Sequence, residues 1–423
     1  MLQINFIREN PEEVINRLKT KNFDASILVS QIIAIDEKRR LAQTKLDDSL
    51  AEANKIAKSF GQLFKEGKRE EADLLKARTA ELKIISKDLS DELEASVQEM
   101  NNLLVQLPNL PHHSVPAGRS AADNEIVVNE GNIPELGADA VPHWDLIKKY
   151  NIIDFELGNK VTGAGFPFYR GKGARLQRAL INFFLDEGVN AGYTEYQPPL
   201  IVNEASAYGT GQLPDKEAQM YAVPLDGFYL IPTAEVPITN IYRDVILKES
   251  DFPQKNVAYS NCFRREAGAW GADVRGLNRL HQFDKVEIVQ IRKPEESYQA
   301  LEEMRDYVAS ILRKLELPFR ILRLCGGDMS FTSALTYDFE VFSAAQKRWL
   351  EVSSVSNFES FQANRMKLRF KDKTGKTIIA HTLNGSALAL PRIVAALLEN
   401  NQTENGINIP KALVPYTGFE VID

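Results

Sequence analysis

The sequence predicts an α+β protein in which a long antiparallel coiled-coil hairpin arm precedes a larger domain built on an antiparallel β-sheet flanked by helices. Three observations predict this class: a proline-free heptad pattern between Ser26 and Gln106, a proline-rich linker after it, and β-rich runs alternating with helices beyond the linker. The 423 residues suggest two or three domains, and a hydrophobic share of 44% is enough for a buried core. We expect an N-terminal domain over 1–107 with its arm at about 27–104, a linker over 108–118, and the main domain over 119–423.

The composition excludes several classes of protein. No run of about 18 uncharged apolar residues occurs, and the first residues lack the basic and apolar regions of a secretory signal. Two cysteines are too few for a disulfide framework, and five histidines without a His-x-x-x-His spacing offer little for a metal cage. The net charge of -7 argues against general attraction to nucleic acid, but it leaves a local basic patch open. We therefore expect a cytoplasmic protein with no membrane segment.

The arm is predicted from two apolar seams. Steps of four and three residues define the first seam, and nine of its eleven positions are apolar, which is typical of a coiled coil. A second seam follows a turn that contains Gly67, so two helices of this length should fold back on each other as an antiparallel hairpin. The first seam is Leu28, Ile32, Ile35, Arg39, Ala42, Leu46, Ser49, Ala53, Ile56, Phe60 and Leu63; the second is Leu75, Leu82, Ile85, Leu89, Leu93, Val97, Met100 and Leu104.

Basic residues gather near the expected tip of this arm. Between Asn54 and Arg69, five basic residues stand against one acid, Glu66. A solvated coiled-coil surface explains most such charge patterns, and on this feature alone it is the better interpretation. The functional alternative is a grip on a phosphate backbone, which would make binding sensitive to salt. The five residues are Lys55, Lys58, Lys65, Lys68 and Arg69.

Beyond the linker, the pattern predicts strands at 228–231, 257–263, 280–291 and 348–355, and helices at 174–186, 294–315 and 387–400. Neither a phosphate-binding Gly-x-x-x-x-Gly-Lys loop nor a Gly-x-Gly-x-x-Gly fingerprint is present, so the common nucleotide cradles are absent. Polar clusters nevertheless occupy strand positions. Alternation places Phe283, Lys285 and Glu287 on one face, where an aromatic ring and charges could hold a base, an ammonium and a phosphate.

Any one of these clusters alone would be better explained as a surface salt-bridge ladder. Charge at several strand positions of one domain is harder to dismiss, because a buried sheet face should be apolar. Ser386 precedes the last predicted helix, and the commonest role of a serine at such a position is that of the helix N-cap. Arg392 near that helix start is unusual, because the helix dipole disfavours a cation there unless an anion compensates, which favours a bound phosphate.

Together these clusters resemble the three signature motifs of class II aminoacyl-tRNA synthetases, and within that class the seryl-tRNA synthetase family. The first motif corresponds to 192–199, a helix-to-strand passage at the family's dimer interface, the second to 262–283 and the third to 385–392. Segments 231–237, 284–287 and 336–338 resemble strings specific to the seryl enzymes. The resemblance covers essentially the whole chain, including the arm.

The resemblance implies an enzyme that activates L-serine with ATP and transfers it to the 3′ end of tRNA(Ser), with tRNA(Sec) as a further substrate of the family. The serine carboxylate is already an anion, so catalysis needs positioning and charge neutralisation rather than a general base. By resemblance, Arg264 contacts the α-phosphate, Arg279 the terminal phosphates and Glu266 the adenine amino group. Phe283 and Arg392 enclose the adenine ring. Arg264 and Arg392 are the expected catalytic residues, and the wider ATP set adds Arg265, Glu351, Val352, Ser353 and Ser354.

The resemblance also implies a serine pocket and a Mg²⁺ site. Glu287 suits the substrate ammonium, while Glu235 and Ser386 suit its hydroxyl. Glu351 and Ser354 offer hard oxygen donors for Mg²⁺. Because residues three apart face opposite sides of a regular strand, we predict a bulge or bend between those two. The full serine-binding set is Thr233, Ala234, Glu235, Glu287, Ser386 and Asn384.

The arm acquires a function from the same resemblance, since in the family it reaches across a homodimer to the long variable arm of serine tRNA. One segment departs from the family pattern: Trp270, Ala272 and Val274 replace a small residue, an arginine and a threonine, which puts acceptor-end contacts of that loop in doubt. Pro391 fits only if the last helix begins late or has a loose first turn.

Two alternatives remain open at this point. A related adenylating ligase could load an amino acid on a carrier protein, although the intact long arm counts against it. A catalytically inactive homologue could serve as an RNA-binding or coiled-coil scaffold. The complete set of arginine, glutamate and serine residues counts against that alternative, because charges on an inner face are costly without a ligand.

Overall fold

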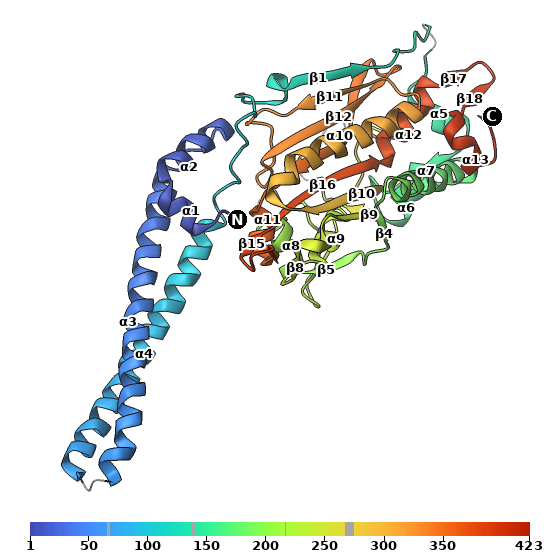
Figure 1. Cartoon of the computed structure of the whole chain (residues 1–423). Coiled ribbons are helices and arrows are strands. Elements are labelled where there is room, and N and C mark those ends of the chain that lie inside the picture. The colour runs from blue at the N-terminus through green and yellow to red at the C-terminus, as the bar shows by residue number, and fades with distance from the viewer. Residues whose placement is uncertain (66–67, 138–139, 216, 267–274) are drawn as a thin grey trace. The chain divides into compact units, whose positions relative to one another are not determined.

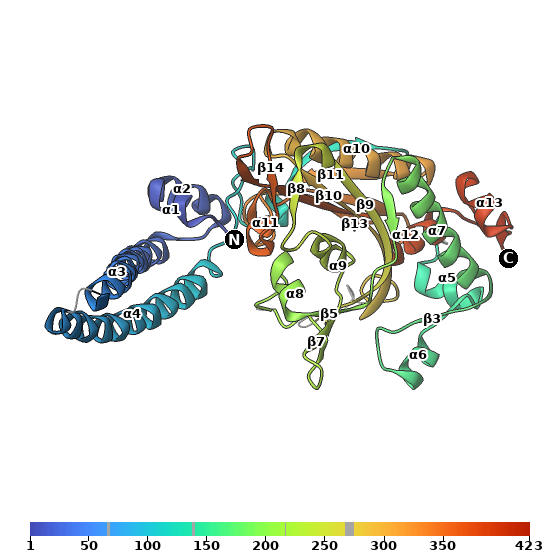
Figure 2. The same cartoon turned by 60° about the horizontal axis from the view of Figure 1, so that its bottom comes forward.

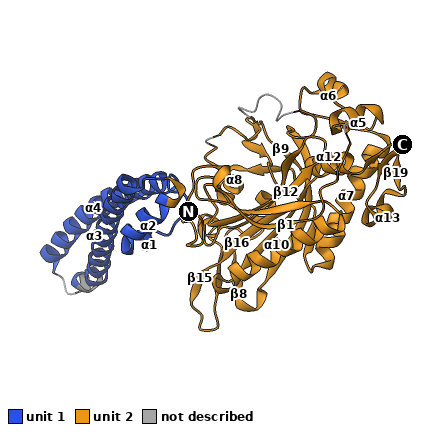
Figure 3. Ribbon diagram, turned by 90° about the horizontal axis from the view of Figure 1, so that it is seen from above, with its two compact units in different colours: residues 1–19, 23–108 blue, residues 20–22, 109–423 orange. Residues whose placement is uncertain are grey.

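The computed structural model describes residues 1–65, 68–137, 140–215, 217–266 and 275–423. The chain divides into two compact units (Figure 3). The first comprises residues 1–19 and 23–108, and the second comprises 20–22 and 109–423. Within the described residues, no helix combines the length and apolar character needed to cross a membrane.

The first unit is the helical hairpin. Two short helices, α1 (Ile4–Glu9) and α2 (Pro11–Leu18), precede the long α3 (Ser26–Lys65), and α4 (Arg69–Leu104) returns alongside it (Figure 1). Every predicted seam position of α3 is buried or half-buried, so the heptad prediction is confirmed there. In α4 the seam differs at one position, because Val97 is exposed and Ser96 is buried in its place, donating to the carbonyl of Glu92.

The second unit is built on an eight-stranded sheet with the order β1-β11-β12-β13-β16-β10-β9-β4. Neighbouring strands are antiparallel except for β4, which runs parallel to β9. This confirms the predicted α+β class. The strands are β1 (Glu125–Glu130), β4 (Thr194–Tyr196), β9 (Gln254–Phe263), β10 (Gln282–Arg292), β11 (Phe319–Arg323), β12 (Leu335–Ser343), β13 (Arg348–Asn357) and β16 (His381–Ala389).

Three helices cover one face of this sheet: α7 (Gly171–Asn190), α10 (Ser297–Lys314) and α12 (Leu390–Asn400) (Figure 1). The main apolar core lies between them and the strands, and Val286 and Ile288 of β10 belong to it. The opposite face of β10 carries Phe283, Lys285 and Glu287, as strand alternation requires. The helices α8 (Glu204–Thr210) and α9 (Glu235–Asn240) lie on that second side (Figure 2).

Smaller elements complete the second unit. The helices are α5 (His143–Lys149), α6 (Phe155–Val161), α11 (Phe361–Met366) and α13 (Val414–Thr417). The remaining strands are β2 (Ile153–Asp154), β3 (Phe168–Tyr169), β5 (Ile201–Asn203), β6 (Ala222–Val223), β7 (Phe228–Leu230), β8 (Ile246–Lys248), β14 (Arg369–Lys371), β15 (Thr377–Ile379), β17 (Gln402–Thr403), β18 (Gly406–Asn408) and β19 (Val421–Ile422).

The last predicted helix begins later than the sequence pattern indicated. Residues 387–389 continue β16, and α12 starts at Leu390 with Pro391 in its first turn. Proline is well tolerated there because its missing N–H has no helical partner at that position. The prediction of a helix from residue 387 and the interpretation of Ser386 as its N-cap are therefore both wrong. Ser386 lies within β16, opposite Glu287 of β10.

Candidate active site

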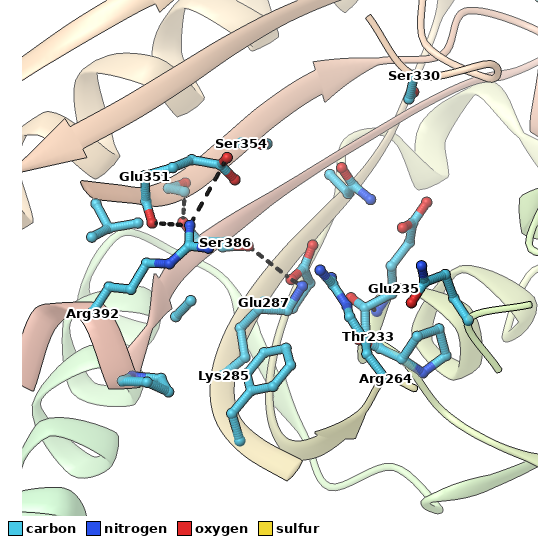
Figure 4. A pocket seen from close by; sticks show the side chains of 18 of the residues that line it. Thr233, Glu235, Arg264, Lys285, Glu287, Ser330, Glu351, Ser354, Ser386 and Arg392 are labelled. Atoms are coloured by element: carbon cyan, nitrogen blue, oxygen red, sulfur yellow. Dashed lines mark hydrogen bonds and ion pairs between the residues drawn. The ribbon is translucent and has the colours of Figure 1, made fainter. Parts of the chain in front are cut away.

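A cavity of about 580 Å³ opens on the polar side of the sheet. Its walls come from β10, β13 and β16, the end of β9, the start of α12 and the segments near residues 212–219 and 330–332. Figure 4 shows residues from these distant parts of the sequence around one space. The cavity brings together fourteen of the predicted site residues: Thr233, Glu235, Arg264, Glu266, Arg279, Phe283, Glu287, Glu351, Val352, Ser353, Ser354, Asn384, Ser386 and Arg392.

One end of the cavity holds a buried carboxyl group. Glu235 begins α9, and its Oε1 accepts a hydrogen bond of 2.6 Å from Nε2 of Gln362. Thr233 Oγ1 accepts from the backbone N–H of Glu235 at 3.2 Å. Burial, reinforced by the negative charge of Glu287, raises the pKa of Glu235 to about 7. Glu235 therefore changes charge near neutral pH, unlike an exposed glutamate.

An ion pair lies in the middle of the cavity. Lys285 Nζ is 2.6 Å from Oε2 of Glu287, and both side chains are almost fully buried. Ser386 Oγ donates to the same Glu287 oxygen at 3.4 Å (Figure 4). Burying two charges is costly even when they pair, so an apolar pair would serve stability as well. The pair indicates a site that is built for a polar ligand.

Three arginines also line the cavity. The guanidinium of Arg264 lies 5.3 Å from the centre of the Phe283 ring. Arg279 pairs with Glu266 at 3.0 Å. Arg392 donates through Nε to the carbonyl of Asn278 at 3.0 Å and through a terminal nitrogen to the carbonyl of Glu351 at 2.7 Å. Three guanidinium groups around one space suit a polyanionic ligand.

The predicted bulge in β13 is confirmed. Phe339 of β12 faces Ser353 and Glu340 faces Glu351, so Val352 is an additional residue in β13. Glu351 and Ser354 both line the cavity as a result, and Figure 4 shows them on its wall.

Asp338 of β12 lies opposite Ser354 in the strand register. Its Oδ1 is buried and has no hydrogen-bond partner among the described residues. Burial and then the charge of Glu351 raise the pKa of Asp338 well above its usual range, although a hydrogen bond from Ser354 opposes them. A nearby positive charge would compensate this arrangement, so the oxygen donors here fit a hard cation such as Mg²⁺.

Two predicted site residues do not line the cavity. Ala234 is fully buried and is absent from the cavity wall, although its sequence neighbours Thr233 and Glu235 both line it. The Arg265 guanidinium lies over the ring of Tyr221 at 5.8 Å. The departures at Trp270, Ala272 and Val274 lie outside the described residues, as does the turn at Gly67.

The basic residues of the arm form a separate cluster in the sequence prediction. Lys55, Lys58, Lys68 and Arg69 are exposed near the end of the hairpin, whereas the side chain of Lys65 is outside the described part of the structure.

Sequence reasoning omitted several residues from the site. Alternation predicts the correct strand face for Lys285 but no role for it, and Asp338 belongs to segment 336–338, whose resemblance assigns it no role either. No local signal identifies Gln362, because it reaches Glu235 from a different part of the chain. The other omitted lining residues include Gln212, Glu217, Gln219, Asn278, Ser330, Thr332 and Ser356.

Comparison with known proteins places this cavity in a family. Residues 1–111 match the seryl-tRNA synthetase N-terminal domain, and residues 222–401 match the tRNA synthetase class II core domain (G, H, P, S and T). A serine–tRNA ligase of Salinibacter ruber is 52% identical over 99% of this chain and 98% of its own length. One from Akkermansia muciniphila is 48% identical over 100% and 99%.

Solved structures agree with this match. The seryl-tRNA synthetase of Pyrococcus horikoshii complexed with ATP superposes with a TM-score of 0.92 at 35% identity, covering 100% of this chain and 99% of that one. The cytoplasmic serine–tRNA ligase of Naegleria fowleri in complex with AMP gives a TM-score of 0.88 at 27% identity, with the same coverage. The chain therefore belongs to the seryl-tRNA synthetase family of class II aminoacyl-tRNA synthetases, and its reaction is the ATP-dependent ligation of serine to tRNA.

Proposed function

We propose that the cavity is the place where serine is activated, with serine at the Glu235–Glu287 end and ATP at the arginine end. The observation that carries this proposal is the division of charge within one space. Buried carboxyl groups line one end, Arg279 and Arg392 line the other, and Arg264 lies between the two ends. This division matches the ammonium and the phosphates of the two substrates.

In the first step, an oxygen of the serine carboxylate attacks the α-phosphorus of ATP, and the bond from that phosphorus to the diphosphate breaks. No proton moves, because the nucleophile is an anion. The residues have to align the two reactants and offset negative charge in the transition state. We assign that task to Arg264, whose position over Phe283 leaves its guanidinium between the two ends of the cavity. In the second step the 3′-terminal hydroxyl of tRNA attacks the seryl carbonyl carbon, the bond from that carbon to the phosphate oxygen of AMP breaks, and the hydroxyl proton is released together with AMP.

Serine selection follows from the carboxyl groups. Glu287 would hold the ammonium, sharing its charge with Lys285, and Glu235 with Ser386 would bond the substrate hydroxyl. Thr233 and Asn384 line the same end. Alanine would leave these buried partners without a hydrogen bond, which is penalised more than a missing methylene.

ATP would occupy the opposite end. Arg392 and Phe283 would enclose the adenine, and Glu266 would accept from its amino group. Arg279 is paired with Glu266 at 3.0 Å, so contact with the terminal phosphates requires it to exchange that partner. Arg265 remains a predicted ATP contact.

Glu351 and Ser354 would hold Mg²⁺. Asp338 would accept the hydrogen bond from the Ser354 hydroxyl, which leaves the lone pairs of the Ser354 oxygen for the metal. When bound, Mg²⁺ supplies positive charge beside the phosphate oxygens and orients them.

The arm and an edge of the sheet would bind macromolecules. We propose that Lys55, Lys58, Lys65, Lys68 and Arg69 contact the backbone of tRNA(Ser) and, as a further substrate, tRNA(Sec). We also propose a homodimer. Strand β4 lies at the end of the sheet order with all three residues exposed, which leaves an unpaired edge that a second copy could cover. We further propose a cytoplasmic location, because serine, ATP and tRNA are available together there.

The central experiment is ATP-dependent transfer of labelled serine to bulk bacterial tRNA, with alanine and threonine as competitors. Transfer that resists both competitors supports the proposal. The variant Glu235→Ala should lose discrimination between serine and alanine, whereas Glu135→Ala, at an exposed site, should retain it. Equal relative activation rates in the wild type and Glu235→Ala would contradict the role given to Glu235.

A further inference from the structure

A buried histidine–carboxylate pair lies behind the ATP end of the cavity. His143, the first residue of α5, and Glu399, in the last turn of α12, are both fully buried, and neither lines the cavity. Glu399 Oε1 accepts from the backbone N–H of His143 at 2.9 Å and from its ring Nδ1 at 2.8 Å.

The position of Glu399 is unfavourable for the stability of a charged carboxylate, so the residue needs compensating contacts. A carboxylate in the last turn of a helix opposes the helix dipole, and burial adds a second cost. Although burial tends to raise it, hydrogen bonds from His143 and Ser343 hold the pKa of Glu399 below its usual range. Gln346 adds its backbone N–H at 3.3 Å and its side-chain amide at 3.0 Å. This carboxylate is therefore charged and surrounded by donors.

The other ring nitrogen of His143, Nε2, faces the backbone of residues 276–277. Because Nδ1 donates to Glu399, Nε2 carries a lone pair, and it accepts from the backbone N–H of Leu277 at 2.9 Å. Gly276 has a φ of +63°, and a Cβ there would lie 2.4 Å from Nε2 of His143. The backbone of residues 276–277 therefore rests directly on the imidazole.

Two connections lead from this contact into the cavity. The carbonyl of Asn278 accepts from Nε of Arg392 at 3.0 Å, and Arg279 lines the cavity beside it. The Asn278 side chain donates to Oε1 of Gln346 at 3.0 Å, and Gln346 in turn donates to Glu399. The same α12 carries Arg392 near its start and Glu399 near its end.

We propose that His143 and Glu399 are positioning residues of the ATP site: they fix the backbone of residues 276–279, which presents Arg279 to the cavity and the Asn278 carbonyl to Arg392. The inference rests on the proposed role of this end of the cavity in binding ATP. Glu399 sets the tautomer and orientation of His143, and His143 holds the N–H of Leu277.

The test compares variants of His143 in serine-dependent ATP–diphosphate exchange. His143→Leu removes the acceptor for Leu277 and one donor for Glu399, so the KM for ATP should rise about tenfold, while the KM for serine changes by less than about twofold. His143→Gln should restore most of the ATP affinity, because one amide can donate to Glu399 and accept from Leu277. Gln346→Ala changes a less buried residue of the same hydrogen-bond network, and it should raise the KM for ATP about threefold. This variant tests the inference even if His143→Leu does not fold.

His381 provides a matched control. It is another largely buried histidine, bonded through Nδ1 to Ser297 Oγ at 2.8 Å and absent from the cavity wall. His381→Leu should lower the melting temperature without changing the KM for ATP. The inference is wrong if folded His143→Leu keeps its KM for ATP, if it raises both KM values equally, or if His143→Gln is as impaired as His143→Leu. An absence of exchange in the wild type would instead refute the proposed function of the cavity.

Discussion

The arm and the cavity use the same charged residue types under opposite conditions. On the arm, Arg78 pairs with Glu52 at 2.7 Å while both side chains stay about 40% exposed. In the cavity, Lys285 and Glu287 pair at 2.6 Å with at most 7% exposed. Water screens the first pair, so it contributes little to stability, whereas desolvation makes the second pair expensive. Charge on the arm is consistent with a solvated helix, and charge in the cavity requires a ligand to account for it.

One residue of the arm unit departs from this contrast. Asp36 of α3 is fully buried and contacts Arg8 at 2.9 Å, Arg39 at 2.8 Å and Arg40 at 3.2 Å. Here the compensating charges come from the protein itself. A buried carboxylate therefore indicates a ligand site only where its surroundings leave it uncompensated, as they do at Glu235 and Asp338.

The largest expected effect tests whether the cavity's charges serve catalysis. Arg264→Ala should reduce serine-dependent ATP–diphosphate exchange about 100- to 1000-fold, because a preorganised positive charge is lost from the transition state. Arg264→Lys should recover only part of this, since lysine lacks the planar fork. The control Arg313→Ala removes an exposed arginine that pairs with Glu130 at 2.6 Å and should leave exchange unchanged. If Arg264→Ala exchanged at the wild-type rate, Arg264 would have no catalytic role, and its charge would serve only the structure of the cavity.

The second prediction measures what the buried carboxyl of Glu235 costs. Its folded-state pKa is about 7 against an ordinary value of 4.5, so the folded protein binds a proton more tightly than the unfolded chain. The free energy of unfolding of the ligand-free protein should therefore fall as pH rises from about 4.5 to 7, by up to about 3 kcal/mol at this site, and then stay level. Glu235→Gln should abolish that dependence. Urea denaturation at pH values on both sides of this window tests it, and an unchanged slope in the variant would contradict it.

The third prediction concerns the exception at Asp36. Burial tends to raise the pKa of Asp36, but the hydrogen bonds from Arg39 and Arg8 outweigh this effect and lower the pKa. Its stabilising contribution should be complete above the unfolded-state pKa of about 4 and disappear as pH falls through the lower folded-state value. At neutral pH, Asp36→Asn should destabilise the arm by about 2 kcal/mol, because the hydrogen bonds from partly exposed arginines to a charged carboxylate are lost. Hydrogen exchange of peptides from α1 to α3 would measure this.

The control for Asp36 is Asp47→Asn, which changes an exposed acid on the same helix that accepts from Gln43 at 2.9 Å. This variant should stay within about 0.5 kcal/mol of the wild type. Equal protection in both variants would mean that the buried cluster contributes no more than an exposed one.

The smallest effect is expected at the tip of the arm. Replacing Lys55, Lys58, Lys68 and Arg69 with glutamine should raise the KM for tRNA about tenfold and flatten its dependence on salt, because backbone contacts are lost. Serine activation should not change. The matched control replaces four exposed lysines nearer the base of the hairpin, Lys38, Lys45, Lys83 and Lys87, and should have a weaker effect. A loss of activation in the tip variant would make the arm structural.

The sequence predicted the arm well because its rule is local. Every seam position of α3 from Leu28 to Leu63 is buried or half-buried, since a heptad spacing faces one partner helix along its whole length. In α4, Ser96 rather than the predicted Val97 is buried in the seam, which shows the limit of that rule. Four-residue steps in the second seam shift the packed face, and only the partner helix determines which residue fills it.

In the larger domain, the sequence by itself determined the α+β class and the alternation that puts Phe283, Lys285 and Glu287 on one face, and its motifs singled out half of the residues of the cavity wall. Tertiary structure decided the rest. It made Ser386 a strand residue opposite Glu287 rather than a helix cap, brought Gln362 to Glu235, and joined His143 to Glu399 across more than half the chain. Periodicity is set by neighbours along the chain, whereas the burial and compensation of a charge depend on residues distant in sequence that only the folded sheet brings together.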